Sequence, residues 1–202
     1  MTGDRPHLVI VGGPNGSGKT TIARELERAH GLRYLGADAI AEELEPGDWE
    51  RVRIQAGRLF LERARTGIEE GSSLLLESTL SGRTLVGLIQ RARQGGYRIS
   101  VVFVWLESAD HCVARVEERV RKGGHTVPEA DVRRRFPRSL SNFWHLYRPL
   151  ADHWHLLLNS GDVPLDVAID KAGADAEVLD EALFSHYLAL IGETDDSGTT
   201  AP

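Results

Sequence analysis

One short stretch decides the fold of this chain: Gly13-Pro14-Asn15-Gly16-Ser17-Gly18-Lys19-Thr20. It matches the pattern G-x-x-x-x-G-K-[ST] at every fixed position. Glycines allow the backbone to curl so that successive N–H groups point at phosphate oxygens, and a helix that follows adds partial positive charge at its N-terminus. The stretch is therefore predicted to be a phosphate-binding loop (P-loop) for a nucleoside triphosphate.

The sequence on either side of the loop supports this prediction. His7 to Val11 is β-rich and apolar, as a buried parallel strand is, and a helical pattern runs from Lys19 to His30 before Gly31. We expect Gly13–Thr21 to bind the phosphates of ATP, with Lys19 on the β- and γ-phosphates and the Thr20 hydroxyl as a Mg²⁺ ligand. A glycine-rich turn with a chance lysine is the alternative, and the fit to a dinucleotide fingerprint is poor.

Apolar runs and amphipathic stretches alternate along the rest of the chain. Further strands are expected at about 34–37, 74–76, 98–106, 155–158 and 166–170, with helices at about 39–44, 52–67, 82–94, 108–120, 132–147 and 176–191. Pro137 is expected to kink or split the helix that contains it. The alternation predicts a three-layer α/β fold with a mostly parallel sheet. Together with the P-loop, it indicates a P-loop NTPase or kinase fold, and we expect a helical, Arg-rich lid. We expect one domain over 1–191 and a disordered polar tail over 192–202.

Composition excludes several classes of protein. The 202 residues carry a net charge of −6 and are 41% hydrophobic, which is ordinary for a globular chain and gives no sign of general nucleic-acid binding. The single cysteine, Cys112, excludes an internal disulfide and is expected in the core. The apolar run Leu8–Val11 is too short for a signal peptide or a membrane span. We expect a cytoplasmic protein that does not bind membranes.

Two carboxylates follow apolar runs and are expected on the same side as the P-loop. Asp38 follows the second predicted strand and Glu77 the third, and ligands of parallel sheets bind beyond the carboxyl ends of the strands. A carboxylate there can accept a proton from an attacking hydroxyl or hold Mg²⁺ through water. The alternatives are a helix N-cap for Asp38 and a solvated strand-end charge for Glu77. No strand ends in an obvious Mg²⁺-binding aspartate, and Leu106-Glu107 comes nearest.

A cluster of basic side chains follows the fourth strand, and we expect residues 123–150 to form a lid. Closing it over a triphosphate would neutralise charge on the transferred group. The alternative is a solvated helix face, because three successive arginines cannot all point one way. The cluster consists of Arg119, Arg121, Lys122, His125, Arg133, Arg134, Arg135 and Arg138.

Taken together, these segments resemble the zeta toxin family of P-loop kinases and its ATPase-like relatives. The matching segments are GPNGSGKTT (13–21), LGADAIAEEL (35–44), ESTLSGR (77–83), ERVRKGGHTVPEADVRRRF (118–136) and SNFWHLYRPLADHWHLLLNS (141–160). The resemblance implies a kinase that uses ATP and Mg²⁺ to phosphorylate UDP-N-acetylglucosamine, and a small helical antitoxin as a partner. Chloramphenicol phosphotransferases are similar in the P-loop and in the aspartate after the second strand.

The resemblance also implies roles for individual residues. Asp38 would deprotonate the acceptor hydroxyl, Lys19 would contact the phosphates, and Arg119 would stabilise phosphate from the lid. Glu77, Thr79 and Arg83 would bind the sugar substrate. The family's second lid arginine falls close to residues 125–128, where this chain has none. Arg133, Arg134 or Arg135 would take its place, and Arg134 is assigned that catalytic role here.

Two other functions stay open at the level of sequence. One is a kinase of a drug or of a nucleic-acid 5′ end. The other is a non-catalytic ATP-binding module that is controlled by a partner protein. Both keep the P-loop, but the second has little need for both Asp38 and Glu77.

Overall fold

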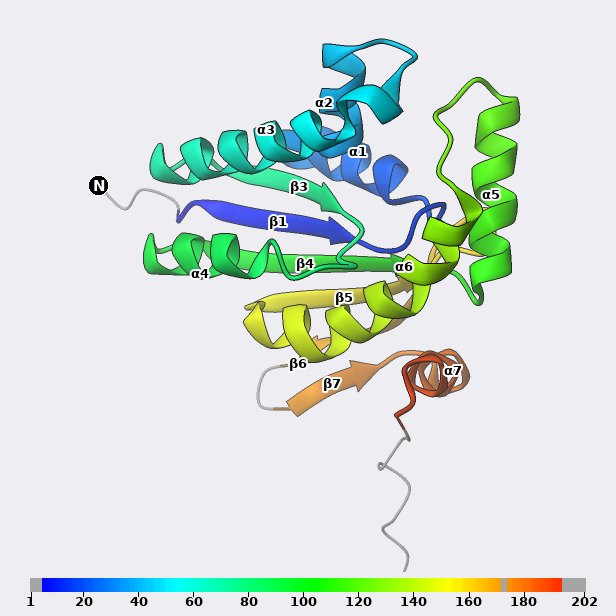
Figure 1. The fold of residues 1–202 in the computed structure, drawn as a ribbon. Helices are drawn as coiled ribbons and strands as arrows, with labels where there is room; N and C mark the ends of the chain where they lie inside the picture. Colours follow the sequence, from blue (N-terminus) through cyan, green and yellow to red (C-terminus); the bar gives the residue numbers. More distant parts are fainter. Residues whose placement is uncertain (1–4, 172–173, 194–202) are drawn as a thin grey trace, which may run out of the picture.

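The apolar run before the P-loop forms the central strand of the sheet. In the computed structural model, which describes residues 5–171 and 174–193, β1 (His7–Gly12) pairs in parallel with β3 (Leu74–Ser78) and with β4 (Arg98–Trp105). β2 (Arg33–Gly36) pairs in parallel with β3, and β5 (His153–Leu158) with β4. The prediction of a mostly parallel sheet is confirmed (Figure 1).

Two antiparallel strands extend the sheet beyond β5. β6 (Leu165–Lys171) pairs with β5, and β7 (Ala174–Val178) pairs with β6, so the strand order is β2-β3-β1-β4-β5-β6-β7. The helix expected from Ala176 is therefore wrong over its first residues, because α7 is Glu181–Ile191 and the Asp180 side chain caps its start. Alanine and glutamate favour a helix locally, but pairing with β6 decides the conformation here.

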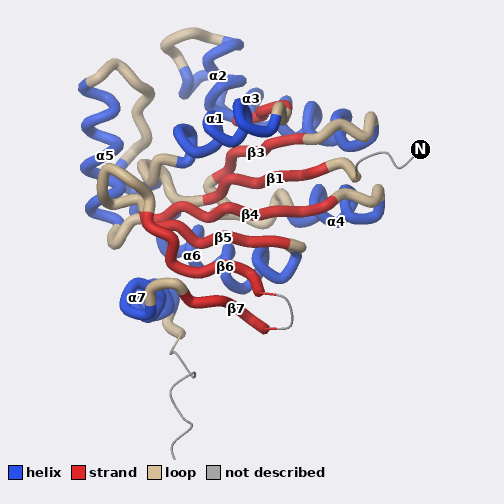
Figure 2. The backbone as a smooth tube through the Cα atoms, turned by 180° about the vertical axis from the view of Figure 1, so that it is seen from behind, coloured by secondary structure: helices blue, strands red, loops and turns tan. Residues whose placement is uncertain are grey.

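Helices cover both faces of the sheet. α3 (Trp49–Glu69), α4 (Val86–Gln94), α6 (Glu129–Asn142) and α7 bury apolar side chains in the larger core, against one face. α1 (Lys19–His30) covers the other face over β1, β2 and β3 and packs Ala23 and Ile22 into a smaller core (Figure 2). The predicted three-layer α/β arrangement is confirmed. Cys112, on α5 (Ala109–Arg121), lies buried in the larger core as expected.

The helix that contains Pro137 is continuous, contrary to the expected split. α6 runs through Pro137, and the change comes later, with a π-helical turn at Phe143–Tyr147 and a 3₁₀ turn at Arg148–Leu150. Val132 and Leu140, on either side of the proline, are both fully buried. Packing of this stripe against the core holds the helix together although Pro137 has no N–H to donate.

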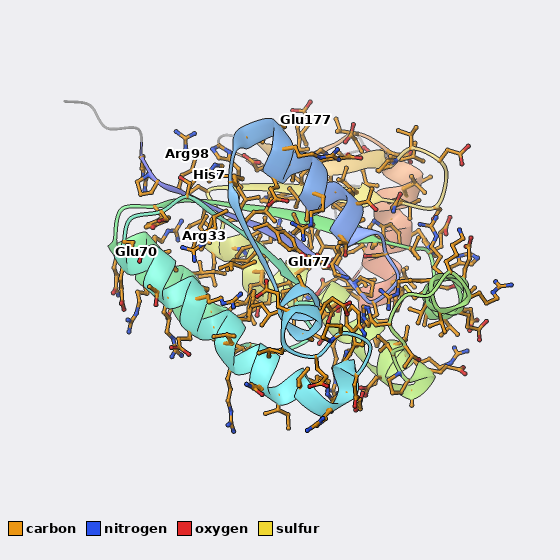
Figure 3. The ribbon with its side chains drawn as sticks, turned by 90° about the horizontal axis from the view of Figure 1, so that it is seen from above. His7, Arg33, Glu70, Glu77, Arg98 and Glu177 are labelled. Atoms are coloured by element: carbon orange, nitrogen blue, oxygen red, sulfur yellow. The ribbon has the colours of Figure 1, made fainter. Side chains whose placement is uncertain are left out.

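The carboxyl ends of the parallel strands meet at one edge of the sheet. Glu77 lies in register with Val11 on β1 and with Gly36 on β2, so it reaches the edge beside the P-loop. Figure 3 shows Glu77 well apart from the labelled charges at the opposite edge, which are His7, Arg33, Glu70 and Arg98. Asp38 and Glu77 were both expected beside the P-loop because this is the edge at which the strands before them end.

The predicted tail at 192–202 lies outside the described residues from position 194 onward. Gly192, with a φ of 78°, ends α7. None of the helices in the described part of the chain is long and apolar enough to cross a membrane.

A buried tyrosine gives a test of how the layers are joined. The Tyr97 hydroxyl donates toward the carbonyls of Gly67, Ile68 and Ser72, at 3.2, 3.2 and 2.9 Å, where α3 ends. Tyr97→Phe should lower the free energy of unfolding by about 1–3 kcal/mol, because these buried carbonyls lose a donor. Urea unfolding followed by circular dichroism measures the change. An unchanged midpoint and slope would show that the hydroxyl does not stabilise the end of α3.

Candidate active site

The P-loop backbone is packed too closely for side chains at its glycines. Gly13, Gly16 and Gly18 have φ values of 144°, 82° and 90°, which residues with a β-carbon rarely adopt. A β-carbon at Gly16 would lie 2.5 Å from the Cys112 carbonyl oxygen, and one at Gly18 would lie 2.2 Å from Asn159 Nδ2. Helix α5 and the end of β5 therefore hold the loop in place.

Two buried donors at or near the loop have no partner among the described residues. α1 begins after Gly18 without a side-chain cap and has no acidic residue in its first turn. Ser17 Oγ and Arg119 Nε are buried and have no hydrogen-bond partner in the part of the chain that the structure describes. Buried polar groups are normally paired, so these orphaned atoms fit a site that is completed by an anion such as phosphate.

Lys19 lies inside the loop and contacts its backbone. Its Nζ donates a hydrogen bond of 2.8 Å to the Pro14 carbonyl. Burial lowers the pKa of Lys19, while the negative charges of Glu77 and Asp38 act in the opposite direction. Phosphate oxygens at this position would stabilise the charged form of the lysine.

Glu77 is held at the start of α1. Its Oε1 accepts a hydrogen bond of 2.9 Å from Thr20 Oγ1, and its Oε2 accepts one of 2.6 Å from the Tyr34 hydroxyl. Glu107, which the sequence singled out as the nearest strand-end carboxylate for Mg²⁺, lies at the end of β4 and accepts from Ser160 Oγ. The carboxylate that contacts the P-loop threonine is therefore Glu77, and Glu107 is not in that position.

Asp38 lies in the first turn of α2 (Ala37–Leu44). The N-cap position is Gly36, so the alternative of Asp38 as an N-cap is wrong. Its side chain is 63% exposed because it faces an open pocket, and its Oδ2 lies 3.2 Å from His125 Nε2. The expected strand-end carboxylate is thus paired with a histidine of the lid region.

His125 connects the lid region to both sides of the pocket. Its ring stacks on Trp49 with 4.5 Å between centroids and 16° between planes. The same Nε2 lies 3.2 Å from Asp38 Oδ2 and 3.2 Å from Arg119 Nη2. One ring nitrogen cannot donate to Asp38 and accept from Arg119 at once, so only one of these two hydrogen bonds forms at a time.

The pKa of Asp38 reflects this environment. Desolvation by the pocket walls raises the pKa of its carboxyl, but the hydrogen bond and charge of His125, with the charges of Lys19 and Arg119, outweigh that effect and lower it. Burial likewise lowers the pKa of Arg119, and Asp38 and Glu77 oppose that shift. The carboxylate therefore stays ionised at neutral pH.

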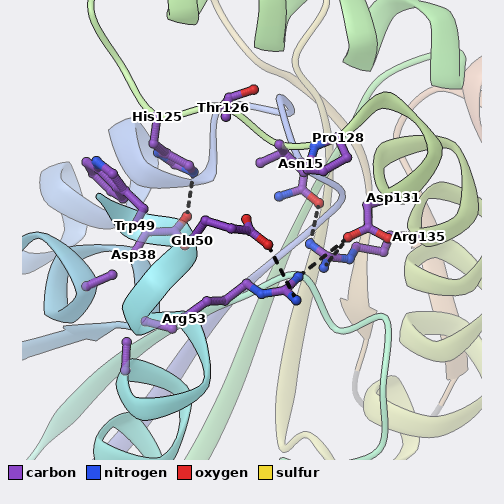
Figure 4. A pocket seen from close by; sticks show the side chains of 14 residues that line it. Asn15, Asp38, Trp49, Glu50, Arg53, His125, Thr126, Pro128, Asp131 and Arg135 are labelled. Atoms are coloured by element: carbon purple, nitrogen blue, oxygen red, sulfur yellow. Dashed lines mark hydrogen bonds and ion pairs between the residues drawn. The ribbon is translucent and has the colours of Figure 1, made fainter. Parts of the chain in front are cut away.

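The pocket beside Asp38 lies between two groups of elements. One wall comes from α2 and the start of α3, and the other from the loop before α6 and the first turns of α6 (Figure 4). Asn15 brings the P-loop into the same pocket. A molecule bound here would lie against Asp38 on one side and the P-loop on another.

The three successive arginines of α6 point in different directions. Arg133 binds Glu129 and Asp110 on the outside of the helix, at 2.7 and 2.6 Å. Arg134, which was assigned to catalysis, binds Asp131 at 2.6 Å and does not line the pocket. Arg135 Nη1 instead donates to Asn15 Oδ1 at 3.3 Å, so Arg135 is the arginine that contacts the P-loop.

The second half of α6 is anchored to the core. Ser139 Oγ donates to the Thr79 carbonyl at 2.6 Å, and Asn142 Nδ2 donates to the Leu80 carbonyl at 2.8 Å. Neither Thr79 nor Arg83 lines the pocket, and Arg83 is exposed. The second half of α6, within the predicted lid 123–150, is thus hydrogen-bonded to the segment after β3, whereas the loop 123–128 contacts Trp49 and Asp38 through His125.

Trp49 was not predicted from the sequence, because it lies at the start of α3, where no motif marks it. His125 was predicted only as a member of the basic cluster, and Arg135 only as one of three candidates for the second lid arginine. Arg135 could have been found by helical geometry: Val132, Phe136 and Leu140 define the buried side of α6, Arg134 lies opposite them, and Arg135 lies beside them. The periodicity of that stripe favoured Arg135 over Arg134.

Comparison with protein families gives a match over most of this region. The model of a family described as "AAA domain" matches residues 8–137, more than half of the chain. The matched segment includes the P-loop, Asp38, Glu77 and Arg119. A shikimate kinase from Rhodopseudomonas palustris is 27% identical over 179 residues, which are 85% of this chain and 81% of that protein.

Solved structures share the fold. The complex of AvrRxo1-ORF1 with AvrRxo1-ORF2 and ATP superimposes with a TM-score of 0.73 and 20% identity, covering 98% of this chain and 67% of that one. The PezAT chromosomal toxin–antitoxin system of Streptococcus pneumoniae gives a TM-score of 0.56 and 13% identity, covering 81% of this chain and 73% of that one. The α/β P-loop kinase fold is confirmed.

The tight packing of the P-loop can be tested with two glycine variants. Gly16→Ala should weaken binding of a non-hydrolysable ATP analogue by about tenfold or more, because the new β-carbon displaces the loop from α5. Gly87→Ala is the matched control, since nothing lies within 4 Å of a β-carbon in that helical position. Calorimetric titration compares both with the parent protein. Equal affinities for all three would contradict the proposed constraint.

The contact between Asp38 and His125 predicts a titration. The Asp38 carboxyl should titrate below its usual range, and His125→Ala should move its pKa upward. Because the folded-state pKa is depressed, Asp38 stabilises the fold above its unfolded pKa and loses that contribution as the pH falls through the folded pKa.

NMR titration of the carboxyl carbon measures the shift, and His111→Ala, which alters a pair with Glu107, is the control. An Asp38 pKa that is unaffected by His125→Ala would show that the contact does not exist in solution.

Proposed function

Since the chain belongs to the AAA domain family, we propose that it is an ATP-dependent kinase that transfers a phosphoryl group to a hydroxyl of a small molecule. The observation that carries the proposal is the shared pocket, in which Asp38 and Asn15 of the P-loop line the same space. A donor phosphate on the P-loop and an acceptor hydroxyl at Asp38 would then be neighbours. The similarity to a shikimate kinase and to a P-loop kinase fold supports this reaction class.

The P-loop residues would hold the donor. Backbone N–H groups of Gly13–Thr21 other than Pro14, and the Ser17 hydroxyl, would bind phosphate oxygens, and Lys19 would leave the Pro14 carbonyl for the β- and γ-phosphates. Thr20 and Glu77 have the hard oxygen ligands that Mg²⁺ prefers, and the two side chains are in contact. Mg²⁺ bound there would neutralise phosphate charge. Thr20 would ligate it directly, and Glu77 would bind it through water.

Asp38 would act as the base. The acceptor oxygen forms a bond to the γ-phosphorus, the bond from that phosphorus to the β,γ-bridging oxygen breaks, and the hydroxyl proton passes to the Asp38 carboxylate. ADP leaves with the bridging oxygen. Because His125 contacts the same carboxylate, the acceptor hydroxyl would take the place of this contact.

Arg119 and Arg135 would stabilise the transferred group from the lid side. Arg119 lies close to Asp38 and Glu77, and Arg135 contacts Asn15 of the P-loop. Arg135 thus takes the role that the sequence assigned to Arg134. The loop 123–128, between α5 and α6, is the segment that would close over the phosphates, within a single kinase domain over 1–191.

UDP-N-acetylglucosamine is the acceptor we favour. The support is the resemblance of five ordered segments to the zeta toxin family, together with the fold similarity to a toxin–antitoxin system. A small helical antitoxin would be the matching partner. Glu77 would then serve Mg²⁺ more than the sugar, because both of its oxygens already have hydrogen-bond donors.

Steady-state ADP release tests the proposal. The purified protein with ATP and Mg²⁺ should release ADP faster when UDP-N-acetylglucosamine is added. Asp38→Ala should lower that rate by about 100-fold or more while the affinity for ATP stays nearly unchanged, because only the proton acceptor is lost. Lys19→Ala should abolish transfer through loss of phosphate binding.

The control is Glu42→Gln, which removes an exposed carboxylate one turn further along α2. No stimulation by UDP-N-acetylglucosamine would exclude this acceptor and call for a screen of other hydroxyl compounds. Full activity of Asp38→Ala would contradict its role as the base.

A further inference from the structure

The pocket beside Asp38 contains an arginine whose hydrogen-bonding capacity is largely unused. Arg53, on α3, lies 3.7 Å from Glu50 and 3.7 Å from Asp131, and it makes no hydrogen bond to any other residue of the described chain. Its side chain is 55% exposed and extends along the pocket wall (Figure 4). A guanidinium group has five N–H donors in a planar fork, which suits carboxylate and phosphate oxygens.

A second arginine converges on the same point from the opposite wall. Arg135 Nη2, on α6, lies 3.0 Å from Asp131 Oδ2, the same oxygen that Arg53 approaches. Arg134 binds the other oxygen of this carboxylate. Of these three arginines, only Arg53 and Arg135 line the pocket, where their guanidinium groups face Asp131 and Glu50. Asp131 Oδ2 marks the position that an anion would occupy between α3 and α6.

The helix that carries Arg53 also supplies an aromatic surface. Trp49 lies one turn before Arg53 on α3, so both side chains project from one face of the helix. Both line the pocket, and the Trp49 ring is stacked on His125 (Figure 4). A bound molecule could therefore contact a flat apolar surface, an arginine and Asp38 at the same time.

We propose that Arg53 and the Nη2 side of Arg135 form an anion subsite for the acceptor, which Asp131 fills within the protein, while Nη1 of Arg135 faces the P-loop and the transferred group. The proposal rests on the kinase function proposed above, because it takes the pocket beside Asp38 as the acceptor site. The acceptor is then a hydroxyl compound that carries a carboxylate or a phosphate, and an uncharged sugar is a poor substrate. A purely structural clasp between α3 and α6 would gain little from the two 3.7 Å pairs of Arg53, since exposed pairs of this kind contribute little stability.

Binding of simple anions tests this subsite without turnover. The P-loop is first saturated with a non-hydrolysable ATP analogue and Mg²⁺, so that it cannot take the probe. Inorganic phosphate and malonate are then titrated separately, and NMR follows the side-chain N–H signals of Arg53 and Trp49. At least one probe should shift both signals in a saturable way, and the stronger probe tells a phosphate from a carboxylate preference.

Two variants distinguish a binding site from a structural clasp. Arg53→Gln should weaken binding of the probe about tenfold or more, read from the Trp49 signal, through loss of charged hydrogen bonds. Asp131→Asn should tighten it about threefold or more, because the competing carboxylate is removed. A clasp predicts the opposite for Asp131→Asn, since its loss would let the arginines move apart. Arg51→Gln is the matched control: it lies half a turn away on α3, is 71% exposed and pairs with Glu45.

The results separate the two proposals. Unchanged or weaker binding in Asp131→Asn, or unchanged binding in Arg53→Gln, would overturn the anion subsite. Thermal unfolding of each variant excludes loss of the fold as the cause. Failure of the ADP-release assay with UDP-N-acetylglucosamine and with every other hydroxyl compound screened would remove the kinase function but would not alter these titrations. Transfer to uncharged acceptors as fast as to charged ones would remove the subsite and leave the kinase function intact.

Discussion

The site depends on one steric constraint, the absence of space beside the P-loop backbone. A β-carbon at Gly13 would lie 2.0 Å from the Val104 carbonyl on β4, while Gly16 is pressed against α5 and Gly18 against Asn159 after β5. The loop is thus fixed between a strand, a helix and the end of a second strand. Lys19 and Thr20 follow directly, so their positions relative to the carboxyl edge of the sheet are set by the same packing.

Several charged groups of the site pair with groups of the protein itself. Lys19 donates to the Pro14 carbonyl, Asp38 is paired with His125, and the pocket arginines share Asp131. Each of these contacts matches a group that ATP or an acceptor would offer: phosphate oxygens, a hydroxyl or an anion. Some of these contacts join α2 and α3 to α6 and the loop before it. Binding of ligands would replace these contacts within the protein by contacts to the ligands, with little net loss of charge pairing.

The features that follow from local sequence were predictable, and those that follow from distant packing were not. The P-loop, α1 with its end at Gly31 and the parallel strands were predicted, and so were Asp38 and Glu77 at one sheet edge. β7 was not, because Ala174–Val178 is extended only through its pairing with β6. The pairing of His125 with Asp38 also depends on where a loop lies in space. Arg135 is an intermediate case, since the buried stripe of α6 contained the information.

The account makes one central claim, that a donor phosphate on the P-loop faces an acceptor site at Asp38. A crystal structure with a non-hydrolysable ATP analogue and Mg²⁺ tests it most directly. The account predicts that Lys19 Nζ leaves the Pro14 carbonyl for the phosphates and that the γ-phosphate points into the pocket between Asp38 and Arg135. Phosphates bound outside the loop, or a γ-phosphate directed away from Asp38, would contradict it.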